Sequence, residues 1–195
     1  PVTSLCSKKP MTLGAIVFDE YMYFRRQLHL AQRNALKVMK EVDGDWRKQF
    51  GRSYGIIDCY ELGDAKICLV TAGSESTTAK FVVKKLRERG KKVGLLRIRA
   101  YRPWPEEELK NALEDVQAIA VADRDISPGS GGILHSEIRS TLYGSGREKA
   151  LNSFIIGLGG RPVHASDFKY MIKQTEKDAS AKRSRVEWIG GMNIK

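Results

Sequence analysis

Short apolar runs alternate with amphipathic stretches through the second half of the chain. Each apolar run ends in a turn that contains glycine, aspartate or proline, and helical periodicity follows each turn. A continuous apolar run of this kind is typical of a buried parallel strand in an α/β sheet. The four runs expected to form such strands are residues 67–70, 93–98, 118–122 and 154–156.

The segments beside these runs complete the predicted fold. Residues 53–62 mix β-branched and aromatic side chains with partial alternation, which indicates an edge strand for which an antiparallel orientation is open. Right-handed crossovers then give a three-layer α/β sandwich with a mostly parallel sheet of about five strands. Apolar periodicity predicts helices over residues 75–89, from 106 onward, over 133–142 and over 166–176.

A long amphipathic helix is expected before the alternating units, over residues 18–42. Its apolar positions recur at spacings of three and four, which gives one continuous stripe. We expect it to end at Asp43-Gly44-Asp45, with a short helical turn over 46–51. The stripe is expected to pack against the sheet or another domain. It consists of Tyr21, Phe24, Leu28, Ala31, Ala35, Val38 and Val42.

The two ends of the chain differ from the middle in composition. Residues 1–17 hold prolines, a glycine and small polar residues, which predicts an extended linker or arm. Residues 178–195 form a basic tail. A chain of 195 residues is long enough for one well-packed domain and short for two. We therefore expect a single α/β domain over residues 18–195.

Composition narrows the class of protein. The hydrophobic content of 42% is ordinary for a soluble globular domain, no apolar run approaches a membrane span, and no signal-peptide pattern is present. The three cysteines are widely spaced and form no CxxC pair. This argues against a zinc, disulfide or iron–sulfur framework and favours reduced cysteines in a cytoplasmic protein.

The formal net charge of +11 is compatible with nucleic acid, an anionic membrane surface or an acidic protein as partner. The positive charges are spread along the chain, mostly on the outer faces of predicted helices, where a solvated surface explains them. No helix-turn-helix, RNP-type or zinc-finger pattern is present. Nucleic-acid binding is therefore the less favoured alternative.

Candidate site residues are sought in the turns, because ligands and partners meet a parallel sheet at the carboxyl ends of its strands. After the first run, Gly73 and Ser74 could present amide groups to an anion. The alternative is a tight turn at Gly73 with a helix cap at Ser74 or Glu75. Neither GxGxxG nor GxxxxGK[ST] occurs, so a nucleotide site is not supported.

The stretch after the third run contains the residue types that most favour a functional site. Asp123, Arg124 and Asp125 precede a loop rich in glycine and serine, residues 126–132. These charges could bind a polar ligand, or an Asp–Arg pair could order the loop at a subunit interface. The residues alone leave both interpretations open.

The turn after the fourth run contains Gly159, Gly160 and Arg161, and its glycines permit close approach of another backbone. His164 beside Asp167 is a weak acid–base candidate. No Ser/His/Asp, metal-binding or paired-carboxylate constellation emerges, so no catalytic, cofactor-binding or metal-binding residue is assigned. Taken alone, the residues predict a regulatory, assembly or partner-binding domain.

Three stretches carry a resemblance to a known family. VTAGSESTTAKFVVKKLRERGKKVGLLRIRAYRPWPEEEL, ADRDISPGSGG and FIIGLGGRPV occur in this order, within a likeness that extends from near Met11 to VEWIGG. They resemble the carboxyl-terminal region of the α chain of pyruvate:ferredoxin oxidoreductase and related 2-oxoacid:ferredoxin oxidoreductases. The matching region is the transketolase C-terminal-like domain, whose α/β sandwich agrees with the predicted fold. One departure lies in the family turn GLGGRDVT, where this chain has Pro162 and His164.

The resemblance implies a component of a thiamine-diphosphate enzyme. Such an enzyme decarboxylates a 2-oxoacid, most often pyruvate, passes electrons through iron–sulfur clusters to ferredoxin, and forms acyl-CoA. Thiamine diphosphate, Mg²⁺ and the clusters would bind other domains, so this chain is expected to hold no cofactor and to support assembly. The implied partners are the pyrimidine-binding, diphosphate-binding, γ and ferredoxin-like parts and ferredoxin itself, with no membrane.

A second function from a different class stays open. The chain could be a free-standing basic α/β module that binds nucleic acid or an acidic protein. The polypeptides or nucleic acid that copurify with the chain would distinguish the two functions.

Overall fold

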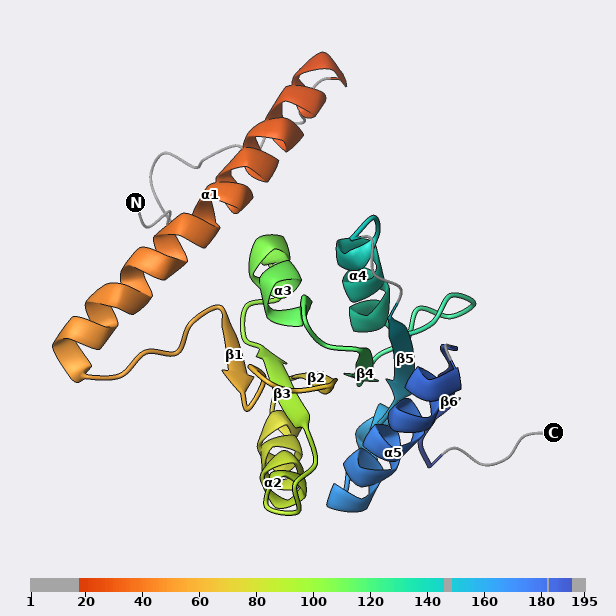
Figure 1. Cartoon of the computed structure of the whole chain (residues 1–195). Coiled ribbons are helices and arrows are strands. Elements are labelled where there is room, and N and C mark those ends of the chain that lie inside the picture. The colour runs from red at the N-terminus through yellow and green to blue at the C-terminus, as the bar shows by residue number, and fades with distance from the viewer. Residues whose placement is uncertain (1–17, 146–148, 182, 191–195) are drawn as a thin grey trace.

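One mixed sheet forms the centre of the fold, as a computed structural model that describes residues 18–145, 149–181 and 183–190 shows (Figure 1). The order across the sheet is β1-β3-β2-β4-β5-β6; β1 is antiparallel to β3 and all other pairs are parallel. The predicted α/β class, the mostly parallel sheet and the edge strand are confirmed. The strands are β1 Ile57–Tyr60, β2 Ile67–Ala72, β3 Val93–Ile98, β4 Ala118–Asp123, β5 Ala150–Ile155 and β6 Val186–Trp188.

Helices cover both faces of the sheet (Figure 1). α2 and α5 pack on one face, over Leu69 and Phe154, while α3 and α4 pack on the other, over Val70 and Ile119. Because successive strand residues point to opposite faces, a continuous apolar run fills both cores at once. The helices are α1 Phe18–Phe50, α2 Glu75–Arg87, α3 Glu106–Leu113, α4 Ile133–Leu142 and α5 Ala165–Ala181, with a 3₁₀ turn at Leu158–Gly160.

The segment predicted as a basic tail, residues 178–195, is part of the sandwich as far as residue 190. α5 continues to Ala181, and β6 adds a sixth strand beside β5, with Val186 opposite Ser153. The prediction failed because polar contacts, rather than an apolar run, hold this strand in place. Residues 191–195, like the linker expected at 1–17, lie outside the described residues.

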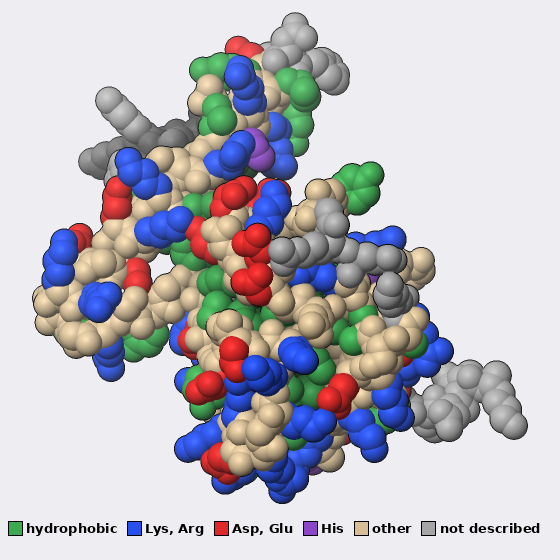
Figure 2. All heavy atoms as spheres, in the orientation of Figure 1, with side chains coloured by type: hydrophobic (Ala, Val, Ile, Leu, Met, Phe, Trp, Pro, Cys, Tyr) green, Lys and Arg blue, Asp and Glu red, His purple; other side chains and the backbone are tan. Residues whose placement is uncertain are grey.

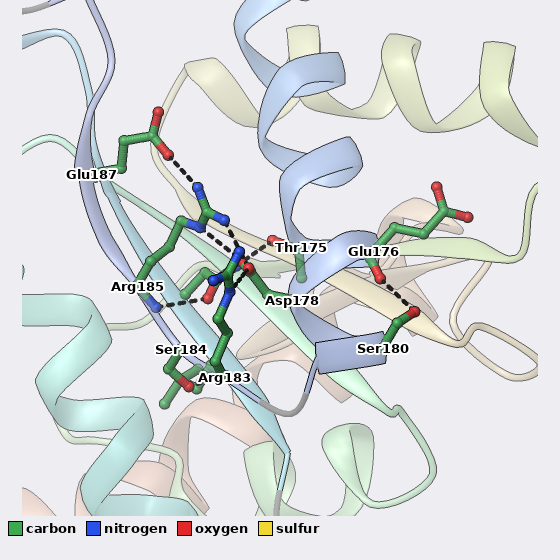
Figure 3. A network of polar contacts seen from close by, with 10 residues as sticks. Thr175, Glu176, Asp178, Ser180, Arg183, Ser184, Arg185 and Glu187 are labelled. Carbon is green, nitrogen blue, oxygen red and sulfur yellow. Dashed lines mark hydrogen bonds and ion pairs between the residues drawn. The ribbon is translucent and has the colours of Figure 1, made fainter.

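A buried carboxylate anchors the approach to β6 (Figure 3). The Asp178 side chain, on α5, is 0% exposed and accepts hydrogen bonds from Arg183 Nε at 2.9 Å and Arg185 Nη2 at 2.7 Å. Asn152 on β5 donates to Asp178 at 2.9 Å and accepts from the Arg185 backbone N–H at 3.0 Å. The Arg185 guanidinium, with help from Arg183, lowers the pKa of Asp178 to about 2.

The last crossover has the opposite hand to the other three. From β4 to β5 and from β5 to β6 the chain moves the same way across the sheet, yet α4 and α5 lie on opposite faces. The β2–β3 connection moves the other way and places α2 on the face opposite α3, so it shares the hand of the two units that follow it. The expected right-handed crossovers concerned the four predicted strands, and the final unit, whose strand β6 was not predicted, departs from their common hand.

α1 is longer than predicted, because it does not end at Asp43-Gly44-Asp45 but continues to Phe50. Asp43 Oδ1 accepts hydrogen bonds from the backbone N–H groups of Tyr54 at 2.7 Å and Gly55 at 3.1 Å. A carboxylate that bonds to the following loop does not compete for the helix's own amides. A single glycine costs only about 1 kcal/mol in a helix, so the turn signal was too weak to end it.

α1 also stands apart from the sandwich (Figure 1). Its apolar stripe is exposed: Leu28 is 42% and Val42 59% accessible. An ion pair between Lys40 and Glu108 of α3 connects the helix to the sandwich. The expectation that the stripe packs against the sheet is therefore wrong, and its packing against another domain remains a proposal.

Candidate functional site

A polar crevice lies at the carboxyl edge of the sheet, between β2 and β4. The chain leaves β2 toward β3 and leaves β4 toward β5, so the loops after these neighbouring strands diverge. This topological switch point is where open α/β sheets meet ligands and partners. The crevice has a volume of about 630 Å³. It brings together the predicted residues Gly73, Ser74, Asp123, Arg124, Asp125, Gly159 and Gly160, and it adds Glu75, Tyr101 and Gly157.

Arg161 is the predicted residue that does not line the crevice. A Cβ atom on Gly190 would lie 2.4 Å from Arg161 Nε, so the arginine side chain covers the turn after β6. The last glycine turn therefore directs its arginine toward the C-terminal segment instead of the switch point.

Asp123, at the end of β4, caps helix α4. Its Oδ1 accepts a hydrogen bond from the Leu134 N–H at 2.7 Å, and its Oδ2 accepts one from the His135 N–H at 3.1 Å. A Cβ atom on Gly132 would lie 2.1 Å from Asp123 Oδ2, so the close approach requires glycine there. The first amides of α4, which could bind an anion, are thus satisfied by the protein's own carboxylate.

Asp125 supplies a second carboxylate to the same helix end, where its Oδ1 accepts a hydrogen bond from the Ile133 N–H at 3.2 Å. Burial raises the pKa of Asp123 to about 7, the amides of His135 and Leu134 oppose this, and the charge of Asp125 raises it further. Asp123 and Asp125 therefore order the loop before α4, as one of the two open interpretations expected, but through backbone amides and not through an Asp–Arg pair.

Arg124 points the other way, across the crevice. Its Nη2 donates to the Gly157 carbonyl oxygen at 3.5 Å, and its Nη1 lies 3.7 Å from Oε2 of Glu75, whose side chain is only 7% exposed. Gly157 has φ +60°, and a Cβ atom there would lie 3.0 Å from Arg124 Nε. Arg124 therefore joins the loop after β4 to the loop after β5 and to the start of α2.

Glu75 is the partner that the sequence analysis missed. The local signal for it is its place as the first residue of α2, directly after the Gly73 turn. Gly73 has φ +82°, as a tight turn requires, while Ser74 makes no side-chain cap to the helix. Since a carboxylate occupies the first turn, the start of α2 is a poor site for an anion.

The crevice does not fit a diphosphate group. Among its lining residues, the three carboxylates of Glu75, Asp123 and Asp125 outnumber the guanidinium of Arg124. Both nearby helix starts carry carboxylates, so a phosphate would meet repulsion instead of free amides. Within the described part of the chain, no group of three or more His, Cys, Asp or Glu residues is placed to hold a metal ion.

The acid–base candidate His164 contacts Asp167 through its backbone. The His164 N–H donates to Asp167 Oδ2 at 2.8 Å, directly before α5. This contact resembles the backward half of a capping box, in which a residue of the first turn satisfies the preceding amide.

In residues 18–145, 149–181 and 183–190, no helix combines the length and apolar character needed to cross a membrane.

Known relatives cover most of the chain. It is 36% identical over 191 residues to the pyruvate synthase subunit PorA of Methanothermobacter thermautotrophicus, which covers 97% of this chain and 48% of the relative. It is 38% identical over 193 residues to the ketoisovalerate oxidoreductase subunit VorA of Pyrococcus abyssi, with coverage of 96% and 49%. The chain thus spans about half the length of these relatives.

A solved structure and a family match complete the comparison. The 2-oxoglutarate:ferredoxin oxidoreductase from Magnetococcus marinus aligns with a TM-score of 0.49 at 16% identity, over 69% of this chain and 21% of that one. Residues 65–168, which run from just before β2 into α5, match the pyruvate:ferredoxin oxidoreductase core domain II. This match includes more than half of the chain and every residue that lines the crevice. The chain therefore belongs to the pyruvate:ferredoxin oxidoreductase core domain II family.

Proposed function

We propose that this chain is a supporting and assembly part of a 2-oxoacid:ferredoxin oxidoreductase. Such an enzyme oxidatively decarboxylates a 2-oxoacid, transfers the acyl group to coenzyme A and passes the electrons to ferredoxin. The observation that carries the proposal is the family match over residues 65–168, together with 36% identity to a pyruvate synthase subunit along nearly the whole chain. The free-standing nucleic-acid or acidic-protein module is not supported by these relatives.

Pyruvate is the proposed substrate, because the relative from Methanothermobacter thermautotrophicus is a pyruvate synthase subunit. A branched 2-oxoacid is the second candidate, because the Pyrococcus abyssi relative is a ketoisovalerate oxidoreductase subunit of similar identity, 38%. The crevice holds carboxylates that already bond to the backbone, so it supports neither substrate directly.

The switch-point crevice is proposed as a contact with another domain of the enzyme. Asp123 and Asp125 fix the start of α4, and Arg124 fixes the Gly157 loop against α2. The result is a rigid polar edge formed by three loops. Charged groups whose geometry is already fixed favour a specific interface, because little side-chain entropy remains to be lost on binding.

The exposed stripe of α1 is proposed as a second assembly element. Continuous apolar surface on an isolated helix is unfavourable in water and marks an interaction site. Tyr21, Phe24 and Val38 are exposed along the same helix as Leu28 and Val42. We assign the covering surface to a neighbouring domain or subunit of the same oxidoreductase.

Thiamine diphosphate, Mg²⁺ and iron–sulfur clusters are proposed to bind other parts of that enzyme, in the cytoplasm. The proposed partners are its pyrimidine-binding, diphosphate-binding, γ and ferredoxin-like parts, with ferredoxin as electron acceptor. The crevice supports this division, since its carboxylates disfavour a diphosphate.

Copurification tests the proposal. An affinity tag is placed on the chain in its source cells, and the retained polypeptides are identified by mass spectrometry and assayed for bound thiamine diphosphate. We expect polypeptides of a 2-oxoacid:ferredoxin oxidoreductase, with thiamine diphosphate, at a constant ratio to the chain. Recovery of the chain with nucleic acid that dissociates steeply with salt, and without thiamine diphosphate, would contradict it.

A further inference from the structure

A larger cavity of about 1240 Å³ lies at the opposite, amino-terminal edge of the sheet, between α2 and α5. Ile67, Val93 and Ile172 belong to its apolar floor. Figure 2 shows Lys and Arg side chains gathered over α2 and α5, at the foot of the molecule. We call this cavity the lysine cleft. Its lysines are Lys66, Lys91, Lys92, Lys149, Lys169 and Lys173, against the acids Asp115 and Glu176.

Three of these lysines have roles within the fold. Lys91 pairs with Glu176 at 2.8 Å, and Lys92 lies 3.7 Å from Asp64. Lys149 donates to backbone carbonyl oxygens at the end of α3, including that of Leu113 at 2.8 Å. A cation there satisfies carbonyl groups that a helix end leaves without partners. These three positive charges are therefore explained by structure alone.

Lys66, Lys169 and Lys173 are not explained in this way. All three are exposed, and their side chains have no ion-pair partner within residues 18–145, 149–181 and 183–190. Lys169 and Lys173 are four residues apart on α5, so they lie on one face, where like charges repel. Neither is in the last turn of α5, which ends at Ala181, so the helix dipole does not account for them.

The shape and chemistry of the cleft indicate a protein segment as the occupant. Small-molecule pockets measure about 300–1,000 Å³, below the volume found here. Among the described residues that line the cleft there is no arginine, and no glycine turn offers converging amides for a phosphate. An apolar floor with a charged rim is the anatomy of a protein interface.

We propose that the lysine cleft binds an acidic segment of another polypeptide, with apolar side chains on the floor and carboxylates at Lys66, Lys169 and Lys173. The identity of the partner rests on the proposed function: it is a further polypeptide of the oxidoreductase. The three lysines would orient the acidic segment and speed its encounter with the cleft, and the apolar floor would supply the area that is buried on binding.

Zero-length crosslinking tests this on the enzyme purified through a tag on the full chain. A carbodiimide joins an amine to a carboxylate without a spacer, so the two groups must lie within contact distance of each other. We expect peptides that join Lys66, Lys169 or Lys173 to Asp or Glu residues of one acidic segment. Lys80 and Lys84, exposed on α2 outside the cleft, are the internal controls and should remain unlinked.

A charge-removal variant supplies the second measurement. Replacing Lys66, Lys169 and Lys173 by glutamine should weaken association with the crosslinked partner about tenfold and reduce its salt dependence. The matched control replaces Lys80, Lys84 and Arg89, which carry the same total charge outside the cleft.

Two results would overturn the proposal. If the oxidoreductase copurifies but the three lysines form no crosslinks and both triple variants associate equally, the cleft is not an interface, although the proposed function stands. If no oxidoreductase polypeptide copurifies, the proposed function fails, and the cleft loses its assigned partner as well.

Discussion

Two buried carboxylates, Asp178 and Asp123, give the fold opposite responses to pH. Guanidinium partners lower the pKa of Asp178 to about 2, while burial raises that of Asp123 to about 7. The pKa of Asp178 is lower in the folded chain than its value of about 4 in the unfolded chain. Asp178 therefore stabilises the fold above about pH 4, and this contribution is lost as the pH falls toward 2. The pKa of Asp123 is higher in the folded chain than in the unfolded chain. Asp123 therefore stabilises the fold below about pH 4, and this contribution is lost as the pH rises toward 7.

Replacing Asp123 by asparagine should remove the second of these responses. Asparagine does not titrate, so the decline in stability that Asp123 causes between about pH 4 and pH 7 should disappear. Urea unfolding of the original chain and the variant at half-unit pH intervals measures this effect, as the change with pH in the difference between their free energies of unfolding. A constant difference across that range would contradict the assigned pKa.

Replacing Asp178 by alanine should destabilise the chain strongly. The change leaves two arginines and Asn152 without their shared partner, and breaking a buried ion pair typically costs about 3 to 5 kcal/mol. Because water can still solvate Arg183 and Arg185, we expect a loss at the lower end of this range, about 3 kcal/mol in the free energy of unfolding. Lys177→Gln on the exposed face of α5 is the control and should change it by less than about 0.5 kcal/mol.

For single residues, the sequence predicted where in the fold the side chains lie better than which groups they bond to. Asp123 and Arg124 were expected at a strand end because the preceding apolar run shows where the strand stops. Their partners could not be read locally: Leu134 lies eleven residues from Asp123, and Gly157 thirty-three from Arg124. The Asp178 cluster gave no signal, because its members are spread over α5, β5 and the segment before β6.

Among the elements, α1 offers a direct comparison between exposed and buried leucines. Leu28→Ala should change the free energy of unfolding of the chain alone by less than about 0.5 kcal/mol, since Leu28 is exposed. Leu113→Ala, at a fully buried position on α3, should cost about 2 to 5 kcal/mol. Equal losses at the two positions in chemical denaturation would show that the stripe is packed within this chain.

The loop after β4 is the element whose function is most open to test. Arg124→Ala in the complete enzyme should weaken assembly, because it releases the Gly157 loop and the contact with Glu75. Turnover should recover when subunits are supplied at high concentration. Analytical ultracentrifugation and steady-state turnover separate the effects: normal assembly with collapsed turnover would place the loop in the active site instead.

The elements themselves were predictable where apolar patterns define them. The edge strand and three of the parallel strands follow from alternating or continuous apolar runs. The fourth, β5, was predicted over 154–156 but begins at Ala150, because the polar Asn152 and Ser153 interrupt its apolar pattern. β6 was missed because polar contacts fix it, and the end of α1 was misplaced because Asp43 bonds to a loop rather than to the helix. In both cases long-range hydrogen bonds overrode a local signal.

For the whole molecule, the family match and three surfaces support one account. The crevice, the α1 stripe and the lysine cleft all lie where a partner could reach them, and none carries an identified catalytic constellation among the described residues. The chain spans about half of its curated relatives, so the complete activity belongs to a larger assembly in this proposal.

Depletion of a cell extract tests that account most directly. Antibodies against the chain are used to remove it in steps, and 2-oxoacid- and coenzyme A-dependent reduction of ferredoxin is measured in the remaining extract. If the chain belongs to the oxidoreductase, activity should fall in proportion to the chain and reappear in the bound fraction. Full activity in an extract that no longer contains the chain would contradict the account.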